Sequence, residues 1–260
     1  MTKVAVLQLA VNESESIVSR MHRVLNIGLP EDLDILVLPE LWLSGAFINS
    51  TETPSDFFDQ FREFSRVNDL LLVAGSIALA TGKKNENRIA IFDHGEYVES
   101  YSKIHLFGFD DGEKTRFQAG NELSLINRYG VDLGFAICYD LRFPELFRKY
   151  RSLGTSVFII PASWPEPRVE HWTTLLKARA IENQAFVIGC NAVGIQGDVT
   201  LGGRSMIISP LGKVYGEASP NNEELLIVTL DFSETEDTRI RFPVNEDIFQ
   251  NYEKIIFTRS

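Results

Sequence analysis

The stretch from residue 131 to residue 145, VDLGFAICYDLRFPE, constrains the fold of this chain more than any other. Residues 133–137 form a compact apolar run with the length of a buried strand. Pro144 and Glu145 are typical of the first turn of a helix, where the N–H that proline lacks needs no partner. A buried strand leading into a helix is the unit of layered α/β folds. The stretch therefore predicts an α/β domain with Cys138 at an elbow between strand and helix.

Cys138 has two interpretations at this elbow. Backbone N–H groups at the turn and the positive end of the helix dipole favour a thiolate and a neighbouring oxyanion, as a nucleophile requires. A cysteine at the end of an apolar strand is also commonly a small buried hydrophobe. The choice between them depends on which other groups the chain brings to Cys138.

The rest of the chain repeats the alternation of strands and helices. Strands are predicted at residues 3–10, 35–38, 70–80, 87–92, 97–101, 156–161, 185–193, 203–209, 212–218 and 224–231, and helices at 17–25, 57–67 and 169–183. The sequence contains no repeat and no linker. We therefore expect one α/β domain over residues 1–260, with residues 232–260 as a C-terminal tail that forms a surface helix or an arm onto a partner subunit.

The charge of the chain argues against two classes of partner. Lys and Arg total 25 against 36 Asp and Glu, which gives a net charge of -11. This charge repels nucleic acid phosphates and anionic membranes. No segment has the roughly eighteen uncharged apolar residues of a membrane span, and the N-terminal apolar run is too short for a secretory signal. The two cysteines form no C-x-x-C pair, so we expect neither disulfide nor thiolate metal site, and a cytoplasmic protein.

Two charged residues follow predicted strands in the first half of the chain. Glu40 lies just beyond the strand at 35–38, where open α/β folds place ligand groups, although a solvated loop carboxylate is the plainer interpretation. Lys103 is flanked by apolar residues and is a candidate for a buried cation, although most lysines lie on the surface. A buried ammonium requires a carboxylate or a developing anion beside it.

Common catalytic motifs are absent from the sequence. It has no G-x-S-x-G, no G-x-x-x-x-G-K-[ST], no G-x-G-x-x-G and no H-E-x-x-H. His105 lies two residues after Lys103, and on a strand both side chains would point to one face. A Cys-His hydrolase with His105 as the base of Cys138 is therefore one hypothesis, and a packed structural histidine is the other.

Three segments together carry a specific resemblance. LPE at Glu40, KIHLF at Lys103 and CYDLRFPE at Cys138 resemble the signature segments of the nitrilase superfamily of carbon-nitrogen hydrolases, in that order and 63 (40 to 103) and 35 (103 to 138) residues apart. The resemblance extends to ASWP around Trp164 and to KARAIENQ at residues 177–184. It is greatest to the omega-amidase type, which hydrolyses the terminal amide of 2-oxoglutaramate and 2-oxosuccinamate.

The resemblance implies a fold and a set of roles. The fold is a four-layer αββα sandwich with two six-stranded sheets, in a homodimer without metal or cofactor. Cys138 would be the nucleophile and Glu40 the proton carrier, while Lys103 and the backbone N–H of Tyr139 would stabilise the oxyanion. Glu113 corresponds to a second glutamate that orients Lys103 or Glu40.

The residues that bind the substrate are less specified. Arg142 matches a substrate carboxylate, but it could instead brace the elbow through Asp140, Glu145 or a partner chain. Trp164 and Phe47 are candidate pocket walls or core residues, and Arg168 and Arg204 are further local cations. We expect a small-molecule amide as substrate. The alternatives are a nitrilase or an N-carbamoyl amidohydrolase of the same superfamily, or a catalytically silent binding member.

Overall fold

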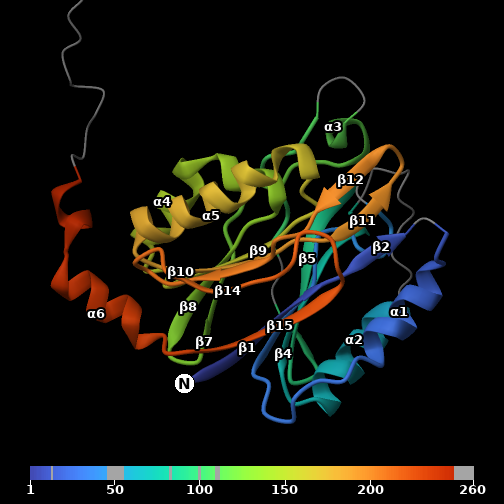
Figure 1. The fold of residues 1–260 in the computed structure, drawn as a ribbon, viewed down its shortest axis with the longest axis horizontal. Helices are drawn as coiled ribbons and strands as arrows, with labels where there is room; N and C mark the ends of the chain where they lie inside the picture. The colour runs from blue at the N-terminus through green and yellow to red at the C-terminus, as the bar shows by residue number, and fades with distance from the viewer. Residues whose placement is uncertain (13, 46–55, 82–83, 99–100, 109–111, 249–260) are drawn as a thin grey trace, which may run out of the picture.

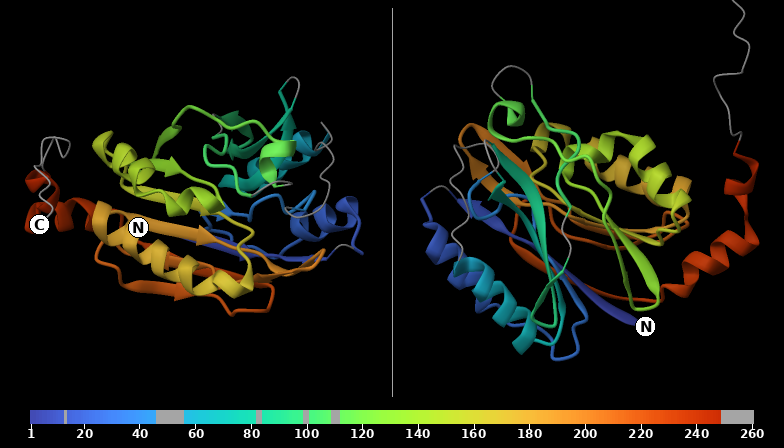
Figure 2. Two further views of the ribbon diagram at one scale, coloured as in Figure 1. Left: turned by 90° about the horizontal axis from the view of Figure 1, so that it is seen from above. Right: turned by 180° about the vertical axis from the view of Figure 1, so that it is seen from behind.

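Two six-stranded sheets stacked face to face form the centre of the molecule (Figures 1 and 2). The computed structural model describes residues 1–12, 14–45, 56–81, 84–98, 101–108 and 112–248. The first sheet has the order β15-β1-β3-β4-β5-β6, with bounds Glu224–Leu230, Thr2–Gln8, Ile35–Val37, Leu71–Ala80, Asn85–Asp93 and Glu96–Val98. The second has the order β14-β13-β10-β9-β8-β7, with bounds Val214–Glu217, Met206–Ile208, Phe186–Cys190, Val157–Pro161, Val131–Phe135 and Leu125–Arg128.

Helices cover the outer face of each sheet, which confirms the predicted four-layer sandwich (Figure 1). Helices α1 (Ile17–Leu25) and α2 (Asp56–Val67) pack on the first sheet, and α4 (Pro144–Ser152) and α5 (Val169–Asn183) on the second. The remaining helical segments are α3 (Glu113–Arg116), α6 (Ser233–Arg241) and the 3-10 turns η1 (Cys138–Arg142), η2 (Glu166–Arg168) and η3 (Val244–Asp247). No helix in the described ranges is long and apolar enough to cross a membrane.

The period of two along β1 shows how one strand serves two layers. Val4 and Val6 belong to the core between the sheets, whereas Ala5 and Leu7 face the layer that holds α1 and α2. All four side chains are almost fully buried. Continuous apolar runs are typical of strands that are covered on both faces.

A third sheet was not predicted. It has the order β12-β11-β2, with bounds Val199–Gly202, Val193–Gln196 and Ala10–Asn12. The predicted strand at residues 3–10 is therefore two strands, since β1 pairs with β3 whereas β2 pairs with β11. Likewise the predicted strand at 185–193 ends at Cys190, and β11 begins at Val193. The apolar pattern is continuous through these switches, so hydrophobicity alone did not reveal them.

The carboxyl ends of β3, β8 and β9 deliver polar residues to one region. β8 and β9 are parallel neighbours, and β3 lies in the facing sheet. Glu40 follows β3 and forms an isolated bridge with Ser76 of β4. This close approach requires Gly75, because a Cβ there would lie 1.9 Å from the carbonyl oxygen of Pro39. The backbone of Glu40 is therefore positioned by backbone contacts alone, independently of its side chain.

Candidate active site

Four of the residues predicted from the sequence form one buried cluster. Glu40 and Lys103 are each 2% exposed, Glu113 is 5% exposed and Cys138 is 8% exposed. They come from four different places: the segment after β3, the segment that pairs with β5, the first turn of α3, and the start of η1. Charged side chains are rarely buried unless they are paired. The interactions within the cluster therefore determine what it can do.

Lys103 bridges the two glutamates. Its Nζ lies 2.7 Å from Oε1 of Glu40 and 2.7 Å from Oε2 of Glu113. Burial alone would lower the pKa of Lys103, but the charges of Glu113 and Glu40 outweigh burial and raise it. The ammonium stays charged, and two of its three N–H bonds are engaged by carboxylates among the described residues.

Asn87 is a member of the cluster that the sequence analysis missed. Its side chain is fully buried, and Nδ2 donates to Oε1 of Glu40 and to Oε1 of Glu113, each at 2.9 Å. The sequence places Asn87 only at the start of a predicted strand. An uncharged asparagine beside Arg88 gives no indication in the sequence of a role in the site. Its partners, Glu40 and Glu113, lie 47 and 26 residues away.

Glu40 is held by its backbone and by both carboxylate oxygens. Oε1 accepts from Lys103 and Asn87, and Oε2 accepts from the backbone N–H of Ser163 at 3.0 Å. The hydroxyl of Ser163 donates to the carbonyl oxygen of Glu40 at 2.8 Å. The segment after β9, which includes Ser163, thus ties Glu40 to the second sheet.

Cys138 has the left-handed backbone of a sharp elbow, with φ of 44°. Burial raises the pKa of its thiol well above the ordinary value, and so do the charge of Glu40 and a hydrogen bond to it, whereas Lys103 acts in the opposite direction. The expectation of a thiolate stabilised by a helix dipole is therefore wrong. Cys138 begins a single 3-10 turn, and α4 starts only at Pro144. A reaction at this sulfur would therefore need a base that takes the thiol proton.

The elbow is braced by Asp140, which is fully buried. Oδ2 accepts from Tyr101 at 2.8 Å and from the N–H of Ile137 at 2.9 Å, and Oδ1 accepts from the N–H of His105 at 2.8 Å. The predicted brace from Arg142 to Asp140 is wrong, as is the one to Glu145, because Arg142 forms no ion pair with a carboxylate of the described residues.

His105 also contacts Asp140. Its Nδ1 lies 2.8 Å from Oδ1 of Asp140, and its ring stacks on Phe143 at 3.7 Å between centroids. The expectation that His105 and Lys103 share a face is wrong, because the chain bends after residue 103 and is not a regular strand. These contacts describe a packed histidine that holds Asp140. They give no support to a Cys138–His105 pair.

Arg179 supports the elbow from α5. Its Nε and Nη2 donate to the carbonyl oxygen of Leu141 at 3.0 and 2.7 Å, and its guanidinium lies over the ring of Phe147. Arg179 is only 4% exposed, which is rare for an arginine. The carbonyl at the end of η1 needs a donor, which explains why an arginine is buried here.

The residues predicted to bind the substrate lie around Trp164. Trp164 is 2% exposed, and the guanidinium of Arg142 lies 4.7 Å from its ring centroid. Nη2 of Arg142 also lies 3.3 Å from Nδ1 of His171. Tyr139, whose backbone N–H is the predicted oxyanion donor, is half-buried with its ring against Phe107.

Three further candidates have separate outcomes. Phe47 lies outside the described residues. The guanidinium of Arg168 lies over the ring of Phe107, whereas Arg204 is paired with Glu170 and Glu217 and is thereby neutralised. Arg142 and Arg168 each form no ion pair with a carboxylate of the described residues, and the guanidinium that lies over the ring of Trp164 is that of Arg142. Within the described part of the chain no group of three His, Cys, Asp or Glu side chains could hold a metal ion.

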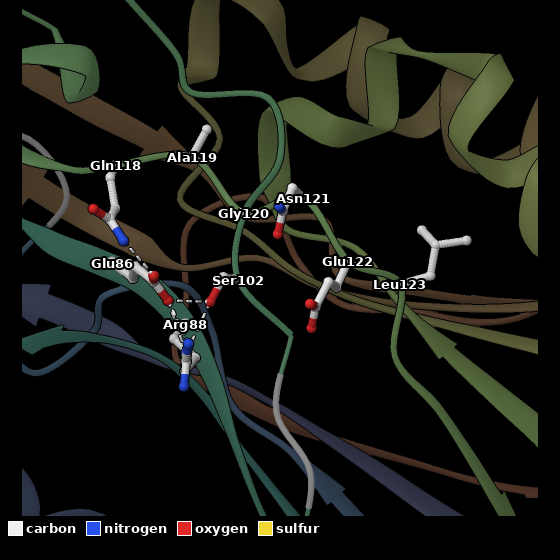
Figure 3. A pocket seen from close by; sticks show the side chains of 9 residues that line it. All are labelled: Glu86, Arg88, Ser102, Gln118, Ala119, Gly120, Asn121, Glu122 and Leu123. Atoms are coloured by element: carbon white, nitrogen blue, oxygen red, sulfur yellow. Dashed lines mark hydrogen bonds and ion pairs between the residues drawn. The ribbon is translucent and has the colours of Figure 1, made fainter. Parts of the chain in front are cut away.

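A polar network lies on the opposite face of the strand that carries Asn87. Glu86 accepts hydrogen bonds from Arg88, Ser102 and Gln118, and these side chains lie together on one wall of a cavity of about 350 Å³ (Figure 3). Residues 86 and 88 point to this cavity, while residue 87 points to the site, as strand alternation requires. The network therefore ties β5 to the segment that carries Lys103.

This network should make stability depend on pH. Burial alone would raise the pKa of Glu86, but hydrogen bonds from Ser102, Gln118 and Arg88 lower it from 4.5 to about 2. The resulting stabilisation of about 3 kcal/mol is present above pH 4.5 and is lost as the pH falls towards 2. Glu86→Gln should lower the free energy of unfolding in urea at pH 7, and the difference from wild type should shrink at pH 3.

Glu122 provides a matched control for this measurement. It lines the same cavity but is exposed. Glu122→Gln should change the free energy of unfolding little at either pH. A Glu86→Gln variant with the same pH dependence as wild type would contradict the assignment of this network.

Comparison with known proteins was made on the whole chain. The model of the family described as carbon-nitrogen hydrolase matches residues 3–240. The chain is 37% identical to a 2-oxoglutaramate amidase of Paenarthrobacter nicotinovorans, over 94% of this chain and 88% of that one. It is 34% identical to omega-amidase YafV of Escherichia coli K12, over 82% of this chain and 84% of that one.

A solved structure extends this likeness to the fold. XC1258 from Xanthomonas campestris is described as a CN-hydrolase superfamily protein with an arsenic adduct in the active site. It superposes with a TM-score of 0.85 at 27% identity and covers 99% of each chain. The family match spans every residue of the buried cluster, from Glu40 to Cys138. The chain belongs to the carbon-nitrogen hydrolase family.

Proposed function

We propose that this chain is an amidase of the omega-amidase type, which releases ammonia from a small carboxylated amide through a cysteine thioester. The observation that carries the proposal is the buried contact between Cys138, Glu40 and Lys103, in which the thiol hydrogen-bonds a carboxylate. Relatives at 34 to 37% identity are named omega-amidase and 2-oxoglutaramate amidase. The fold and the family make it a hydrolase of carbon-nitrogen bonds other than peptide bonds.

In the first step Cys138 attacks the amide carbonyl carbon while its thiol proton passes to Glu40. The raised pKa of the thiol makes this transfer necessary at neutral pH. Oε1 of Glu40 already accepts from two described nitrogen donors and Oε2 from only one, so the thiol proton goes to Oε2. The third N–H of Lys103 and the N–H of Tyr139, at the start of η1 where helical N–H groups lack partners, stabilise the oxyanion.

In the second step the tetrahedral intermediate collapses. Glu40 returns the proton to the leaving nitrogen, the carbon-nitrogen bond breaks, and ammonia departs to leave an acyl thioester on Cys138. Glu40, ionised again, takes a proton from water, whose oxygen attacks the thioester carbonyl. The carbon-sulfur bond then breaks, the thiol regains the proton, and the carboxylic acid leaves. Lys103 remains charged throughout, since two carboxylates hold its proton.

Arg142 is the residue we propose for recognition of the substrate carboxylate. Arg142→Gln should lower kcat/KM for 2-oxoglutaramate by about 10- to 100-fold, mainly through KM, because a charge-assisted hydrogen bond is lost. Pentanamide, which has no carboxylate, should be hydrolysed equally well by variant and wild type. Arg204→Gln is the matched control, because Arg204 is already paired with two glutamates. An equal loss on both substrates would contradict a role in carboxylate binding.

The reaction is tested by ammonia release from a panel of substrates. The purified protein is incubated with 2-oxoglutaramate, pentanamide, a nitrile of the same length and an N-carbamoyl amino acid. The proposal expects the highest kcat/KM on 2-oxoglutaramate. Preference for the nitrile or the carbamoyl compound would replace it with the corresponding activity. No turnover, together with a Cys138 thiol that iodoacetamide does not alkylate, would indicate a binding protein.

We also propose that the chain is a cytoplasmic homodimer. Exposed apolar side chains on and after α6 support a partner, because Ile240 is 71% and Phe242 64% exposed. Figure 1 shows α6 extending from the body of the molecule. Both cysteines are free thiols, as expected in a reducing compartment.

A further inference from the structure

We propose that Asn87 is a positioning residue that locks Glu40 and Glu113 into one geometry and thereby leaves Oε2 of Glu40 as the oxygen that carries the proton. The catalytic part of this inference rests on the proposed function. The locking itself is a property of the buried cluster.

The amide of Asn87 is shared between the two carboxylates. An amide nitrogen has two N–H bonds, and Nδ2 lies 2.9 Å from Oε1 of Glu40 and 2.9 Å from Oε1 of Glu113. Lys103 joins the same two glutamates through Oε1 of Glu40 and Oε2 of Glu113. Two separate bridges therefore connect the carboxylates, so neither can rotate without breaking a charge-assisted hydrogen bond.

Because of these bridges, the two carboxylate oxygens of Glu40 have different numbers of hydrogen-bond donors. Oε1 accepts from Lys103 and Asn87, which fills both of its lone-pair directions. Among the described nitrogen donors, Oε2 accepts only from the N–H of Ser163, and the thiol of Cys138 also hydrogen-bonds Glu40. A carboxylate that lost Asn87 would have a free position on each oxygen, and the thiol proton could then go to either.

The carbonyl oxygen of the Asn87 side chain indicates that the nitrogen, Nδ2, is the atom that serves the site. Oδ1 of Asn87 is buried and has no hydrogen-bond partner among the described residues. An unpaired buried acceptor is unfavourable, so an amide selected only for stability would pair both ends. The reverse orientation would point an oxygen at two carboxylates. The cluster thus uses Asn87 as a donor only.

The backbone places Asn87 and Lys103 side by side. The N–H of Lys103 donates to the carbonyl oxygen of Asn87 at 2.9 Å, and Arg88 and Ser102 form an antiparallel bridge next to it. On the opposite face of the strand, Glu86 accepts hydrogen bonds from Arg88 and Ser102 (Figure 3) and thereby stabilises the pairing of these two segments. Side chains on adjacent strands in register point to the same face, so both donors reach the glutamates.

A neutral donor suits the charge of the site. The charged groups that face Glu40 in the described structure are Lys103 and Glu113, with Cys138 as the titrating partner. One ammonium and two carboxylates sum to -1. A second cation at position 87 would neutralise the cluster and weaken Glu40 as a base, whereas an amide orients it without adding charge.

The test uses Asn87→Ala and Asn87→Asp. Asn87→Ala should lower kcat by about 100-fold with little change in KM. The acid limb of its kcat/KM profile should move to higher pH by about 1 unit, because the ionised carboxylates lose two donors. Asn87→Asp keeps the shape of the side chain but places a third oxygen against them, so it should be at least as impaired as Asn87→Ala. Iodoacetamide alkylation of Cys138 should show the same shift of its acid limb.

Asn183 supplies the matched control, because it is also fully buried and its Oδ1 is also unpaired. Its Nδ2 donates to the carbonyl oxygen of Arg179 and to Oε1 of Glu182, neither of which belongs to the buried cluster. Asn183→Ala should leave both pH profiles unshifted. Wild-type profiles in Asn87→Ala, or near wild-type activity in Asn87→Asp with a loss in Asn87→Ala, would overturn the proposal in favour of packing. If Asn87→Ala unfolds by circular dichroism, Asn87→Ser carries the same expectation.

The alkylation profile separates this inference from the proposed function, since it needs no amide substrate. A shifted alkylation profile in a protein that hydrolyses no amide would retain the locking role and reject the amidase. An unshifted alkylation profile in a protein that does hydrolyse amides would reject the locking role of Asn87 and retain the amidase.

Discussion

Cys138→Ala should abolish ammonia release, with kcat lowered by about 10⁵-fold or more, because no covalent intermediate can form without the sulfur. The measurement is the initial rate of ammonia release from 2-oxoglutaramate at saturating concentration. The substitution removes one sulfur from a side chain that is 8% exposed, so the fold should persist and the melting temperature should change by only a few degrees.

Cys190→Ala is the control for this variant. Cys190 is buried between the sheets, where Sγ lies 3.3 Å from the carbonyl oxygens of Leu7 and Val37. Its loss should reduce stability but leave kcat within a few fold of wild type. Cys138→Ala activity within tenfold of wild type would reject the thioester mechanism.

Glu40→Gln should lower kcat/KM by about 10⁴-fold, the second largest expected effect. The amide keeps the size of the carboxylate but cannot accept the thiol proton, and the raised pKa of Cys138 leaves little thiolate at neutral pH. Ammonia release from 2-oxoglutaramate at pH 7 should therefore slow. A loss of this size with an intact fold would identify Glu40 as the proton carrier of the reaction.

His105→Ala discriminates this mechanism from a Cys-His hydrolase. His105 contacts Asp140 and Phe143, so its loss should loosen the elbow and lower kcat by about tenfold. An effect as large as that of Glu40→Gln would revive His105 as the base. Ammonia release at wild-type rate in Glu40→Gln would likewise contradict the proposed proton transfer.

Much of the sandwich could be predicted because its strands and helices have local patterns. In the predicted helix at 57–67, Phe57, Phe61 and Phe64 recur at helical spacing and are all buried in α2. Between the predicted strands at 87–92 and 97–101, His94 and Gly95 both have the positive φ that a tight hairpin turn requires. The breaks between β1 and β2 and between β10 and β11, where the chain passes from one sheet to another, were not predicted. They depend on which strands pair, and tertiary contacts decide that pairing.

The site divides in the same way. Glu40, Lys103 and Cys138 were found because each lies in a recognisable segment. Asn87 and Arg179 were missed, since their partners are distant in sequence and neither residue type is unusual in its element. The expectation of a thiolate at Cys138 failed for a physical reason, because burial and the neighbouring carboxylate outweigh the ammonium.

The protonated state of Cys138 has a consequence for the chemical survival of the protein. Peroxides oxidise thiolates far faster than thiols, and the first product, a sulfenic acid, leads on to forms that are irreversible. A buried thiol with a raised pKa is a poor target for such oxidants. The burial and the neighbouring carboxylate that raise this pKa therefore protect the sulfur from oxidative damage.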